Sequence, residues 1–225
     1  MLALLPMKKI SERVPNKNIK LLHGKPLYEY VLDMLQNCNT FDFTVVNTDC
    51  EYISDRLQKR YGDFVKIIER PDYLCGNDVS MNRIIEYDIS IFKSYNKFLQ
   101  THSTNPLLTK ATVLKALNIF ENGIFNDTID SLFSVNVIQS RLYYDNINPI
   151  NHSPNTLIKT QDLEEIYEEN SCFYVFSKEG FEKTKSRIGS SPGIYKMSRS
   201  SLEAIEIDTP DDWELVDKIM KAKND

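Results

Sequence analysis

The sequence predicts an α/β protein built on a mainly parallel sheet, with helices covering both faces in a three-layer arrangement. Short runs of β-branched and apolar residues alternate with segments whose apolar residues repeat at helical spacing. Repeated strand–helix units of this kind imply a parallel sheet. The chain has 225 residues, 41% of them hydrophobic and 26% charged, which suits one large α/β domain. We therefore expect a single domain over residues 1–225 with an inserted excursion at about 140–170.

Five strands and four helices are expected in the first 139 residues. Pro26 suits the first turn of the first helix, and Gly62 suits the end of the second. Asp78 or Ser80 can cap the third helix. The strands are expected at 2–5, 41–48, 64–71, 97–103 and 131–139, and the helices at 26–38, 51–62, 81–92 and 109–123.

The alternation stops after residue 140. Residues 141–170 are polar, aromatic and rich in turn-forming residues. Two further strands are predicted at 171–177 and 202–208, and 209–224 reads as a closing helix with its apolar residues on one side.

The overall charge and the cysteines exclude several classes of protein. The formal net charge is −5 and the pI about 5.4, which argues against a nucleic-acid binder. Four scattered cysteines without a CxxC pair suit neither zinc nor a disulfide scaffold, so reduced thiols in a cytoplasmic protein are expected. No apolar run approaches membrane length, so no membrane association is expected.

A basic loop and an acidic segment are expected at the same edge of the sheet, because ligands of parallel sheets bind at the carboxyl ends of the strands. The loop at 6–18 carries four cations and lacks glycine, and 202–214 carries six acids and no base. A metal–polyphosphate ligand suits this pairing, with phosphates on the cations and Mg²⁺ on the carboxylates. The alternative is that the loop is a solvated basic surface. The cations are Lys8, Lys9, Arg13 and Lys17.

Glu206 and Asp208 form the sharpest acidic pair. In a strand, residues i and i+2 point to the same face, so both acids would face one way and could hold a metal. The alternative is an edge strand with solvated acids. Asp211 and Asp212 are expected to serve the start of the closing helix, where acids complement its dipole.

Six motifs in order resemble the CMP-sialic acid synthetase (acylneuraminate cytidylyltransferase) family, and together they run nearly end to end. Any one is weak, whereas six at compatible spacing are specific for the superfamily. They are SERVPNKN followed by LLHGKPL, VVNTD, ERPDYLCGNDVS, FLQTHSTNPLL, EENSCFYVF and IEIDTPDDW.

The chain departs from the family pattern at several positions. Lys8 stands where the family has Arg, which keeps the charge but loses the bidentate fork. Glu12 and Arg13 replace a Lys-Gly pair, and Glu206 replaces the first Asp of the metal pair. The segment with His102 has one extra residue. These departures suggest a divergent subgroup and leave the acceptor open.

The resemblance implies a Rossmann-like nucleotidyltransferase fold and transfer of CMP from CTP to an acidic sugar of the nonulosonic type, for surface glycan synthesis. It implies Mg²⁺ on Glu206 and Asp208, with Lys8, Lys17 and Asp208 as catalytic residues. The nucleotide would be bound by Ser11, Arg13, Asn18, Asp78 and Ser80 as well. The acceptor would be faced by Gln100, Gln161, Asn170 and Tyr174, with Arg141 added only because it lies in the excursion.

The excursion resembles the dimerisation arm of the family, so a homodimer is expected in which each arm reaches the partner's site. No general base is evident; His102 is a candidate by position, with a structural histidine as the alternative. Three other functions stay open. They are a glycosyltransferase of similar fold, a cytidylyltransferase for a non-sialic acceptor, and an inactive binding module.

Overall fold

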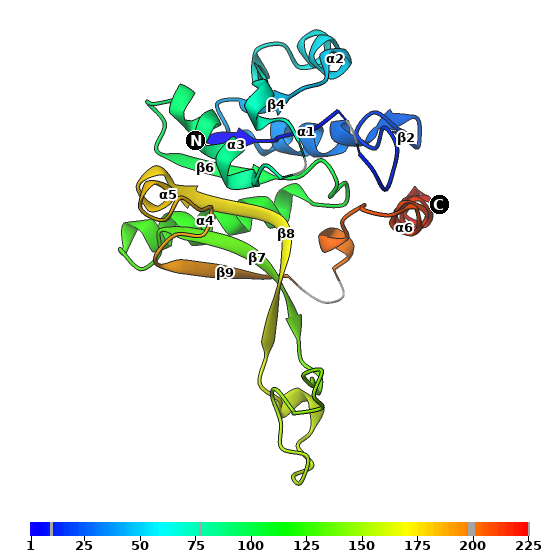
Figure 1. Ribbon diagram of the computed structural model, residues 1–225, viewed down its shortest axis with the longest axis vertical. Coiled ribbons are helices and arrows are strands. Elements are labelled where there is room, and N and C mark those ends of the chain that lie inside the picture. The colour runs from blue at the N-terminus through cyan, green and yellow to red at the C-terminus, as the bar shows by residue number, and fades with distance from the viewer. Residues whose placement is uncertain (10, 77, 198–200, 225) are drawn as a thin grey trace.

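The computed structural model describes residues 1–9, 11–76, 78–197 and 201–224. They form a seven-stranded sheet in the order β5-β4-β1-β6-β8-β7-β9 (Figure 1). Only β8 among these strands runs antiparallel to its neighbours, so the mainly parallel sheet is confirmed. The strands are β1 (Leu2–Leu4), β4 (Thr44–Thr48), β5 (Val65–Glu69), β6 (Lys97–Thr101), β7 (Ser131–Ile138), β8 (Ile166–Ser177) and β9 (Pro192–Met197).

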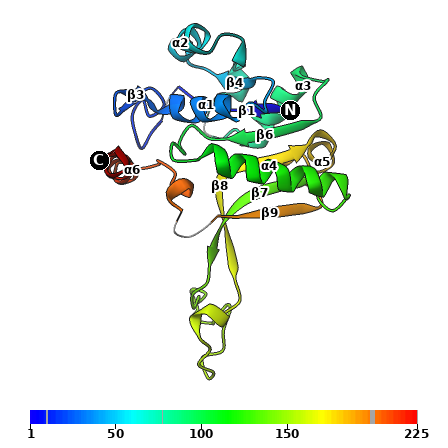
Figure 2. The ribbon, with the colours of Figure 1, turned by 180° about the vertical axis from the view of Figure 1, so that it is seen from behind.

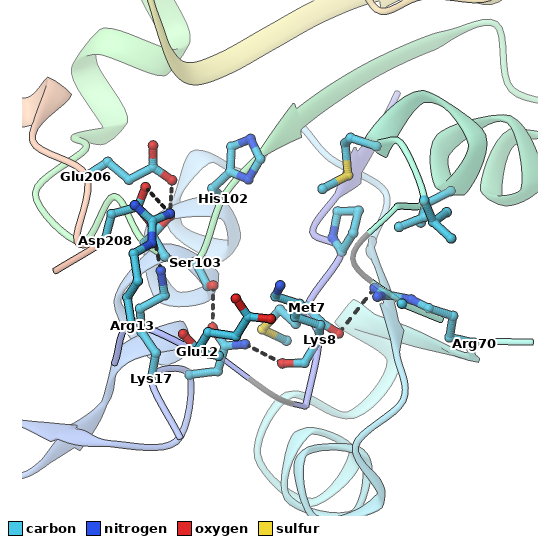
Figure 3. Close-up of a pocket in the computed structure, with 18 residues that line it drawn as sticks. Met7, Lys8, Glu12, Arg13, Lys17, Arg70, His102, Ser103, Glu206 and Asp208 are labelled. Atoms are coloured by element: carbon cyan, nitrogen blue, oxygen red, sulfur yellow. Dashed lines mark hydrogen bonds and ion pairs between the residues drawn. The ribbon is translucent and has the colours of Figure 1, made fainter. Parts of the chain in front are cut away.

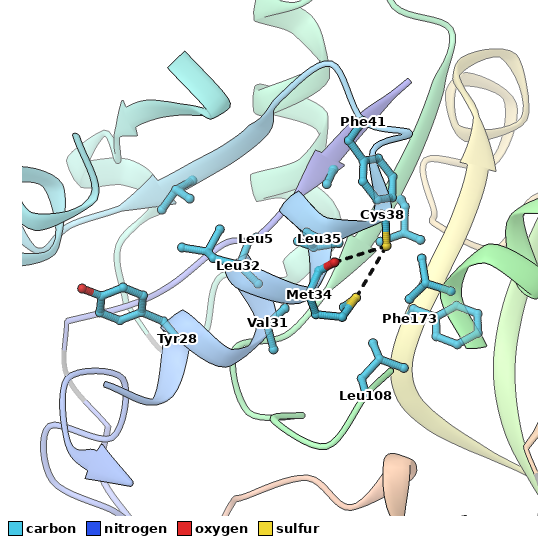
Figure 4. Close-up of a cluster of buried hydrophobic side chains, with 14 of the residues drawn as sticks. Leu5, Tyr28, Val31, Leu32, Met34, Leu35, Cys38, Phe41, Leu108 and Phe173 are labelled. Atoms are coloured by element: carbon cyan, nitrogen blue, oxygen red, sulfur yellow. Dashed lines mark hydrogen bonds between the residues drawn. The ribbon is translucent and has the colours of Figure 1, made fainter. Parts of the chain in front are cut away.

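Helices cover both faces of the sheet, which confirms the three layers. The helices α1, α2 and α4 contribute to one apolar cluster with one face of the strands (Figures 2 and 4), and α3 and α5 contribute to a second cluster with the other face. The helices are α1 (Leu27–Cys38), α2 (Glu51–Tyr61), α3 (Met81–Ile91), α4 (Lys110–Phe125), α5 (Lys178–Thr184) and α6 (Pro210–Asn224). Short 3₁₀ turns lie at Gly62–Phe64, Asp72–Leu74, Thr160–Asp162 and Leu202–Ala204.

The central strand β1 shows why the apolar spacing produces this arrangement. Leu2 and Leu4 pack into the cluster with α3, whereas Ala3 packs into the cluster with α1, because successive side chains point to opposite faces. All three are fully buried between β4 and β6. A strand covered on both faces needs a continuous apolar run, which the sequence supplies.

The predicted element ends hold to within a few residues. Gly62 follows α2 with φ +52°, a left-handed conformation that glycine adopts without strain. Pro26 precedes α1 as its N-cap and is not its first helical residue. The small hairpin of β2 (Leu21–Leu22) and β3 (Lys25–Pro26) was not predicted, because two-residue strands carry no periodic signal.

The predicted strand at 202–208 is wrong. Ser201 Oγ accepts a hydrogen bond from Glu203 N at 3.3 Å at the start of a 3₁₀ turn. Further on, Ile207 N donates to Thr104 O at 2.8 Å, so the segment is tied to the loop after β6. The edge position beside β7 is occupied by β9, which the sequence analysis missed because its first residues are Pro and Gly.

The β7–β8 ribbon extends beyond the rest of the sheet and carries residues 139–165, called the arm below. Residues 135–138 pair with 166–169, and a register shift near Ser171 (φ +56°) marks where the ribbon leaves the sheet. The arm projects away from the body and does not fold back onto the sheet (Figures 1 and 2).

Candidate functional site

A cavity of about 300 Å³ opens where the carboxyl ends of the parallel strands meet, as the rule for such sheets predicts. Its walls come from the first loop (6–18), the stretch from β5 into α3 (70–84), the loop after β6 (102–104) and the acidic segment (206–208). The basic loop and the acidic pair therefore share one cavity, although about 190 residues separate Lys17 from Asp208. In Figure 3 the acids lie beside Arg13 and Lys17, with Arg70 at the opposite wall.

Asp208 is held by both cations of the first loop. Lys17 Nζ donates to Asp208 Oδ1 at 2.9 Å and to Ile207 O at 2.8 Å. Arg13 Nη2 donates to Asp208 Oδ2 at 3.1 Å. Burial by itself raises the pKa of Asp208, but the hydrogen bond and the charge of Lys17, followed by those of Arg13, outweigh it and lower the pKa. The carboxylate is therefore ionised at neutral pH.

Glu206 lies in a drier part of the same cavity. Burial raises its pKa above the usual range, a hydrogen bond from Thr104 opposes the rise, and the negative charge of Asp208 adds to it. Thr104 Oγ1 donates to Glu206 Oε1 at 2.8 Å. Ile207, between the two acids, is fully buried. Glu206 and Asp208 therefore face the same site, as their i and i+2 spacing predicted, although the segment is not a strand.

The start of α6 fixes the backbone of Asp208. Asp212 Oδ2 accepts hydrogen bonds from Asp208 N at 3.0 Å and from Thr209 N at 2.7 Å. Thr209 Oγ1 in turn accepts from Asp212 N at 3.2 Å, a reciprocal cap. The expectation that Asp212 serves the helix agrees with this geometry. Trp213 of the same helix packs in one apolar cluster with Val14 of the first loop.

The acidic side chains of the cavity can hold a divalent cation only if a bound ligand supplies further oxygen atoms. No group of three or more acids, histidines or cysteines suitable for a metal occurs within 1–9, 11–76, 78–197 and 201–224. Mg²⁺ is commonly held by one or two carboxylates together with substrate phosphates and water. Glu206 and Asp208 supply those two carboxylates, so the residues present fit a magnesium ion that arrives with a polyphosphate.

Asn18 braces the first loop. Its Nδ2 donates to Lys8 O at 2.9 Å, and its Oδ1 accepts from Ser103 Oγ at 2.7 Å. The side chain is buried, and it ties the backbone at Lys8 to the loop after β6. Lys8 and Ser11 line the cavity, as expected of phosphate ligands.

Arg70 is a cavity residue that the sequence analysis did not single out. Its Nε donates to Asn47 Oδ1 at 2.8 Å, and its Nη2 donates to Met7 O at 3.2 Å and Asn47 O at 2.9 Å. Asn47 Nδ2 donates to Asp88 Oδ1 at 2.6 Å. Arg70 directly follows β5 in the ERPDYLCGNDVS motif, and its position at a strand end was the signal that could have identified it.

The buried carboxyl of Asp88 should make stability depend on pH. Burial raises its pKa to about 7, against opposing contributions from Asn47 and Arg70, and Oδ2 has no hydrogen-bond partner in the part of the chain that is described. The folded protein thus keeps a proton that the unfolded chain releases near the usual aspartate pKa of 3.8. This contribution to stability is complete below about pH 4 and is lost as the pH rises to about 7.

We therefore expect the free energy of unfolding of the wild type to fall relative to that of Asp88→Asn between about pH 4 and 7, and the difference to stay constant above that range. Urea unfolding of both proteins at several pH values measures this. Asp55→Asn, at an exposed position on α2, controls for loss of a carboxylate. Parallel curves for the wild type and Asp88→Asn would show that Asp88 does not hold the proton.

Gln100, His102 and Tyr174 form a second polar group next to the cavity. Arg187, which the sequence analysis missed, donates from Nη1 to Gln100 Oε1 and lies over the Tyr174 ring at 3.8 Å. Gln100 Nε2 then donates to Thr101 O at 2.8 Å and lies 3.2 Å from His102 Nε2. Since Arg187 can only donate, Gln100 Nε2 is the donor to His102, whose proton is on Nδ1.

Burial first, and then the charge of Arg187, lower the pKa of His102 to about 4. The ring is therefore neutral near pH 7. Because its Nε2 lone pair already accepts from Gln100, the geometry agrees better with a structural histidine than with a general base.

The remaining predicted residues are not brought into this cavity. Asp78 and Ser80 are exposed in the loop before α3, next to its lining residue Val79. Arg141 and Gln161 are exposed on the arm. Asn170 lies in the β8 irregularity, where its Oδ1 accepts from Ser134 Oγ at 2.6 Å and from Cys172 N at 3.1 Å.

Comparison with known proteins shows which family the chain belongs to. A family model described as cytidylyltransferase matches residues 2–224. The chain belongs to the cytidylyltransferase family. The resemblance of the six motifs is thereby confirmed, and the chain is a nucleotidyltransferase by family.

Cytidylyltransferases that act in sugar-acid metabolism are among its relatives. The chain is 27% identical to the CMP-N,N'-diacetyllegionaminic acid synthase of Legionella pneumophila, covering 100% of this chain and 97% of the relative. It is 25% identical to the pseudaminic acid cytidylyltransferase of Campylobacter jejuni, over 100% and 97%. It is 23% identical to the N-acylneuraminate cytidylyltransferase of Escherichia coli O18:K1:H7, over 99% of this chain but 52% of the relative, so it spans about half of that protein.

Solved cytidylyltransferase structures share the fold. CMP:2-keto-3-deoxy-manno-octonic acid synthetase complexed with CTP superposes with a TM-score of 0.70 at 13% identity, covering 99% of this chain and 98% of that one. The 4-diphosphocytidyl-2C-methyl-D-erythritol synthase of Anaerococcus prevotii gives 0.66 at 11% identity, covering 98% of each chain. Within the described residues, no helix is both long and apolar enough to cross a membrane.

Proposed function

We propose that this cytidylyltransferase transfers CMP from CTP to an acidic sugar of the nonulosonic type, releasing pyrophosphate and supplying an activated sugar for surface glycan synthesis in the cytoplasm. The observation that carries the proposal is the convergence of Lys17, Arg13, Glu206 and Asp208 in one cavity. Cations there suit the triphosphate, and the acids suit a magnesium ion that travels with it. The names of the relatives support the acidic sugar.

The reaction is an in-line displacement at phosphorus. A hydroxyl oxygen of the acceptor attacks the α-phosphorus of CTP and forms a bond to it, and the hydroxyl proton is released to water. The bond from the α-phosphorus to the bridging oxygen breaks, and that oxygen leaves with the pyrophosphate. Lys8 and Lys17 line the cavity and would stabilise the charge of the departing pyrophosphate. Glu206 and Asp208 would hold Mg²⁺, which neutralises phosphate charge when bound.

The first loop must exchange partners for this step. Lys17 and Arg13 both pair with Asp208 in the structure, so one of their two positive charges is already compensated before the nucleotide binds. A triphosphate and its cation would take over both roles, the phosphates pairing with the cations and the cation with the acids. This exchange gives each of these charged groups an opposite charge as its partner before and after the nucleotide binds, which avoids the cost of an isolated charge.

The acceptor is proposed to lie next to Gln100 and Tyr174, on the far side of His102 from the acids. Arg141, Gln161 and Asn170 are proposed to reach an acceptor through a homodimer in which the excursion at 140–170 of one copy extends to its partner. The arm carries exposed apolar side chains that a solvated loop does not need. They are Tyr143, Tyr144, Ile147, Ile150 and Leu157.

The test is a pyrophosphate-release screen of four nucleoside triphosphates against 2-keto-3-deoxy sugar acids, including N-acylneuraminic, legionaminic and pseudaminic acids. Release from CTP with one of these acids supports the proposal. Consumption of a nucleotide-sugar without pyrophosphate release would indicate a glycosyltransferase of similar fold. Calorimetry with CTP, with and without Mg²⁺, separates an active enzyme from an inactive binding module.

Replacing Lys17 should weaken the use of CTP. The Lys17 side chain is 12% exposed, and Lys17→Met keeps an unbranched side chain of similar length while removing one charge-assisted contact. We expect kcat/KM for CTP to fall about tenfold to a hundredfold. Lys59→Met, at an exposed position on α2, should leave it unchanged. An equal effect of both variants would contradict a phosphate-binding role for the loop.

A further inference from the structure

We propose that Arg187 binds the carboxylate of the acidic acceptor and so selects sugar acids over neutral sugars. The proposal rests on the proposed function and names the residue that recognises the substrate class. Arg187 lies in the segment between α5 and β9, where none of the six family-like motifs falls. Contacts with three separate elements of the fold position it next to the cavity.

The guanidinium of Arg187 is held by contacts with β6 and β8. Its Nη1 donates to Gln100 Oε1 of β6, and its Cζ lies over the Tyr174 ring of β8, 3.8 Å from the ring centre. The backbone N–H of Arg187 donates to Asn82 Oδ1 of α3 at 3.3 Å. A stacked and hydrogen-bonded guanidinium is pre-organised for a planar bidentate partner.

The charge of Arg187 lacks a counterion among the described residues. Across the described residues, Arg187 forms no ion pair within 4.0 Å, whereas Arg13 and Lys17 of the first loop both pair with Asp208. Its neighbours Gln100 and Tyr174 are neutral groups. Glu169 is the acid whose negative charge acts on Arg187 and, against the larger effect of burial, raises its pKa, and its carboxylate accepts a hydrogen bond from the Tyr174 hydroxyl.

The charged form of a partly buried guanidinium without a counterion is energetically unfavourable. Burial lowers the pKa of Arg187, which shows that the surroundings disfavour its charge. The described protein groups accept a hydrogen bond from Nη1 only, so the edge formed by Nε and Nη2 is left for a ligand. An anion bound there would both pair with the charge and satisfy these donors.

Arg187 lies next to the cavity that holds the first loop and the acids. Gln100 connects Arg187 to His102, and His102 lines the cavity that holds Lys17 and Asp208. The molecule therefore has two cationic centres at one strand edge, separated by a neutral amide and imidazole. The first loop suits the triphosphate, so the second centre suits a second anion, and the carboxylate of a sugar acid is an anion of matching shape.

Calorimetry tests this with N-acetylneuraminic acid and its C1 methyl ester as probes, each titrated in the presence of CTP without Mg²⁺. We expect the wild type to bind the acid at least tenfold more tightly than the ester, and Arg187→Met to remove that preference. Arg187→Lys should keep part of it, because a charge remains without the fork. The affinity for CTP should be unchanged in both variants.

Arg83→Met is the matched control, because Arg83 is exposed on α3 and outside the cavity. Melting temperatures report whether each variant folds. Where pyrophosphate release is measurable, Arg187→Met should raise KM for the acid at unchanged KM for CTP, a split that a general structural defect would not give.

Three results would overturn the proposal: no preference for the acid in the wild type, unchanged binding of the acid by Arg187→Met, or loss of CTP affinity in its place, which would assign Arg187 to the nucleotide. Failure of the proposed function is recognised separately. A wild type that binds the acid through Arg187 but releases no pyrophosphate from CTP would refute the reaction and leave the carboxylate site standing.

Discussion

Asp208→Asn should abolish cytidylyl transfer while leaving the fold intact. The substitution keeps the size of the side chain and removes the charge that Lys17 and Arg13 share. The amide offers one acceptor oxygen in place of two, so one cation loses its partner, and the site loses a ligand charge for Mg²⁺. We expect kcat to fall on the order of a thousandfold.

The measurement is pyrophosphate release at saturating CTP over a range of Mg²⁺ concentrations. Glu206→Gln should also lower the rate, though less, because Glu206 is already stabilised by Thr104 and faces no cation at hydrogen-bond distance in the described structure. Asp211→Asn, the same change at an exposed position in the first turn of α6, is the matched control. Near-normal rates of both cavity variants at limiting Mg²⁺ would refute the metal assignment.

Charging the tip of the arm should separate the proposed homodimer and remove its activity. Leu157 is 93% exposed and Ile147 75% exposed in the single chain, so replacing either by Glu costs an isolated chain almost no stability. In a dimer the same residues would be buried against the partner, where an unpaired carboxylate is strongly unfavourable. We expect the Leu157→Glu/Ile147→Glu variant to be monomeric and inactive, with an unchanged melting profile of the monomer.

Sedimentation at micromolar concentration distinguishes one copy of 26.1 kDa from two. Phe125→Glu is the control, since Phe125 is 89% exposed on α4, outside the arm, and should not affect assembly. A wild type that is monomeric and active would end the dimer hypothesis and would return Gln161 to an intrachain role.

The sequence by itself determined the architecture and the edge of the sheet where the site lies. Helical and extended spacing are local properties, so the β1, β4 and β6 strands and the α1, α2 and α4 helices could be predicted from apolar periodicity. The position of the basic loop followed from the rule for parallel sheets. The order of the motifs identified the family.

The alternation of apolar and polar residues gave a wrong strand prediction where the segment has no neighbouring strand to pair with. Residues 202–208 have the alternation of a strand, but their backbone bonds the loop after β6, and β9 takes the sheet edge. Alternation records which side chains are buried, and it carries no information about a hydrogen-bonding partner. It still placed Glu206 and Asp208 correctly, because both face the cavity while Ile207 is buried.

Only the tertiary structure decided which partners the charged side chains have. Lys17 meets Asp208 across 191 positions, Arg70 reaches Asn47, and Arg187 meets Gln100 across 87. Such pairings depend on how helices and loops pack onto the sheet, and no short-range spacing encodes them. For that reason the sequence could name the cations of the first loop, whereas the unpaired guanidinium of Arg187 became visible only once β6, β8 and α3 were assembled around it.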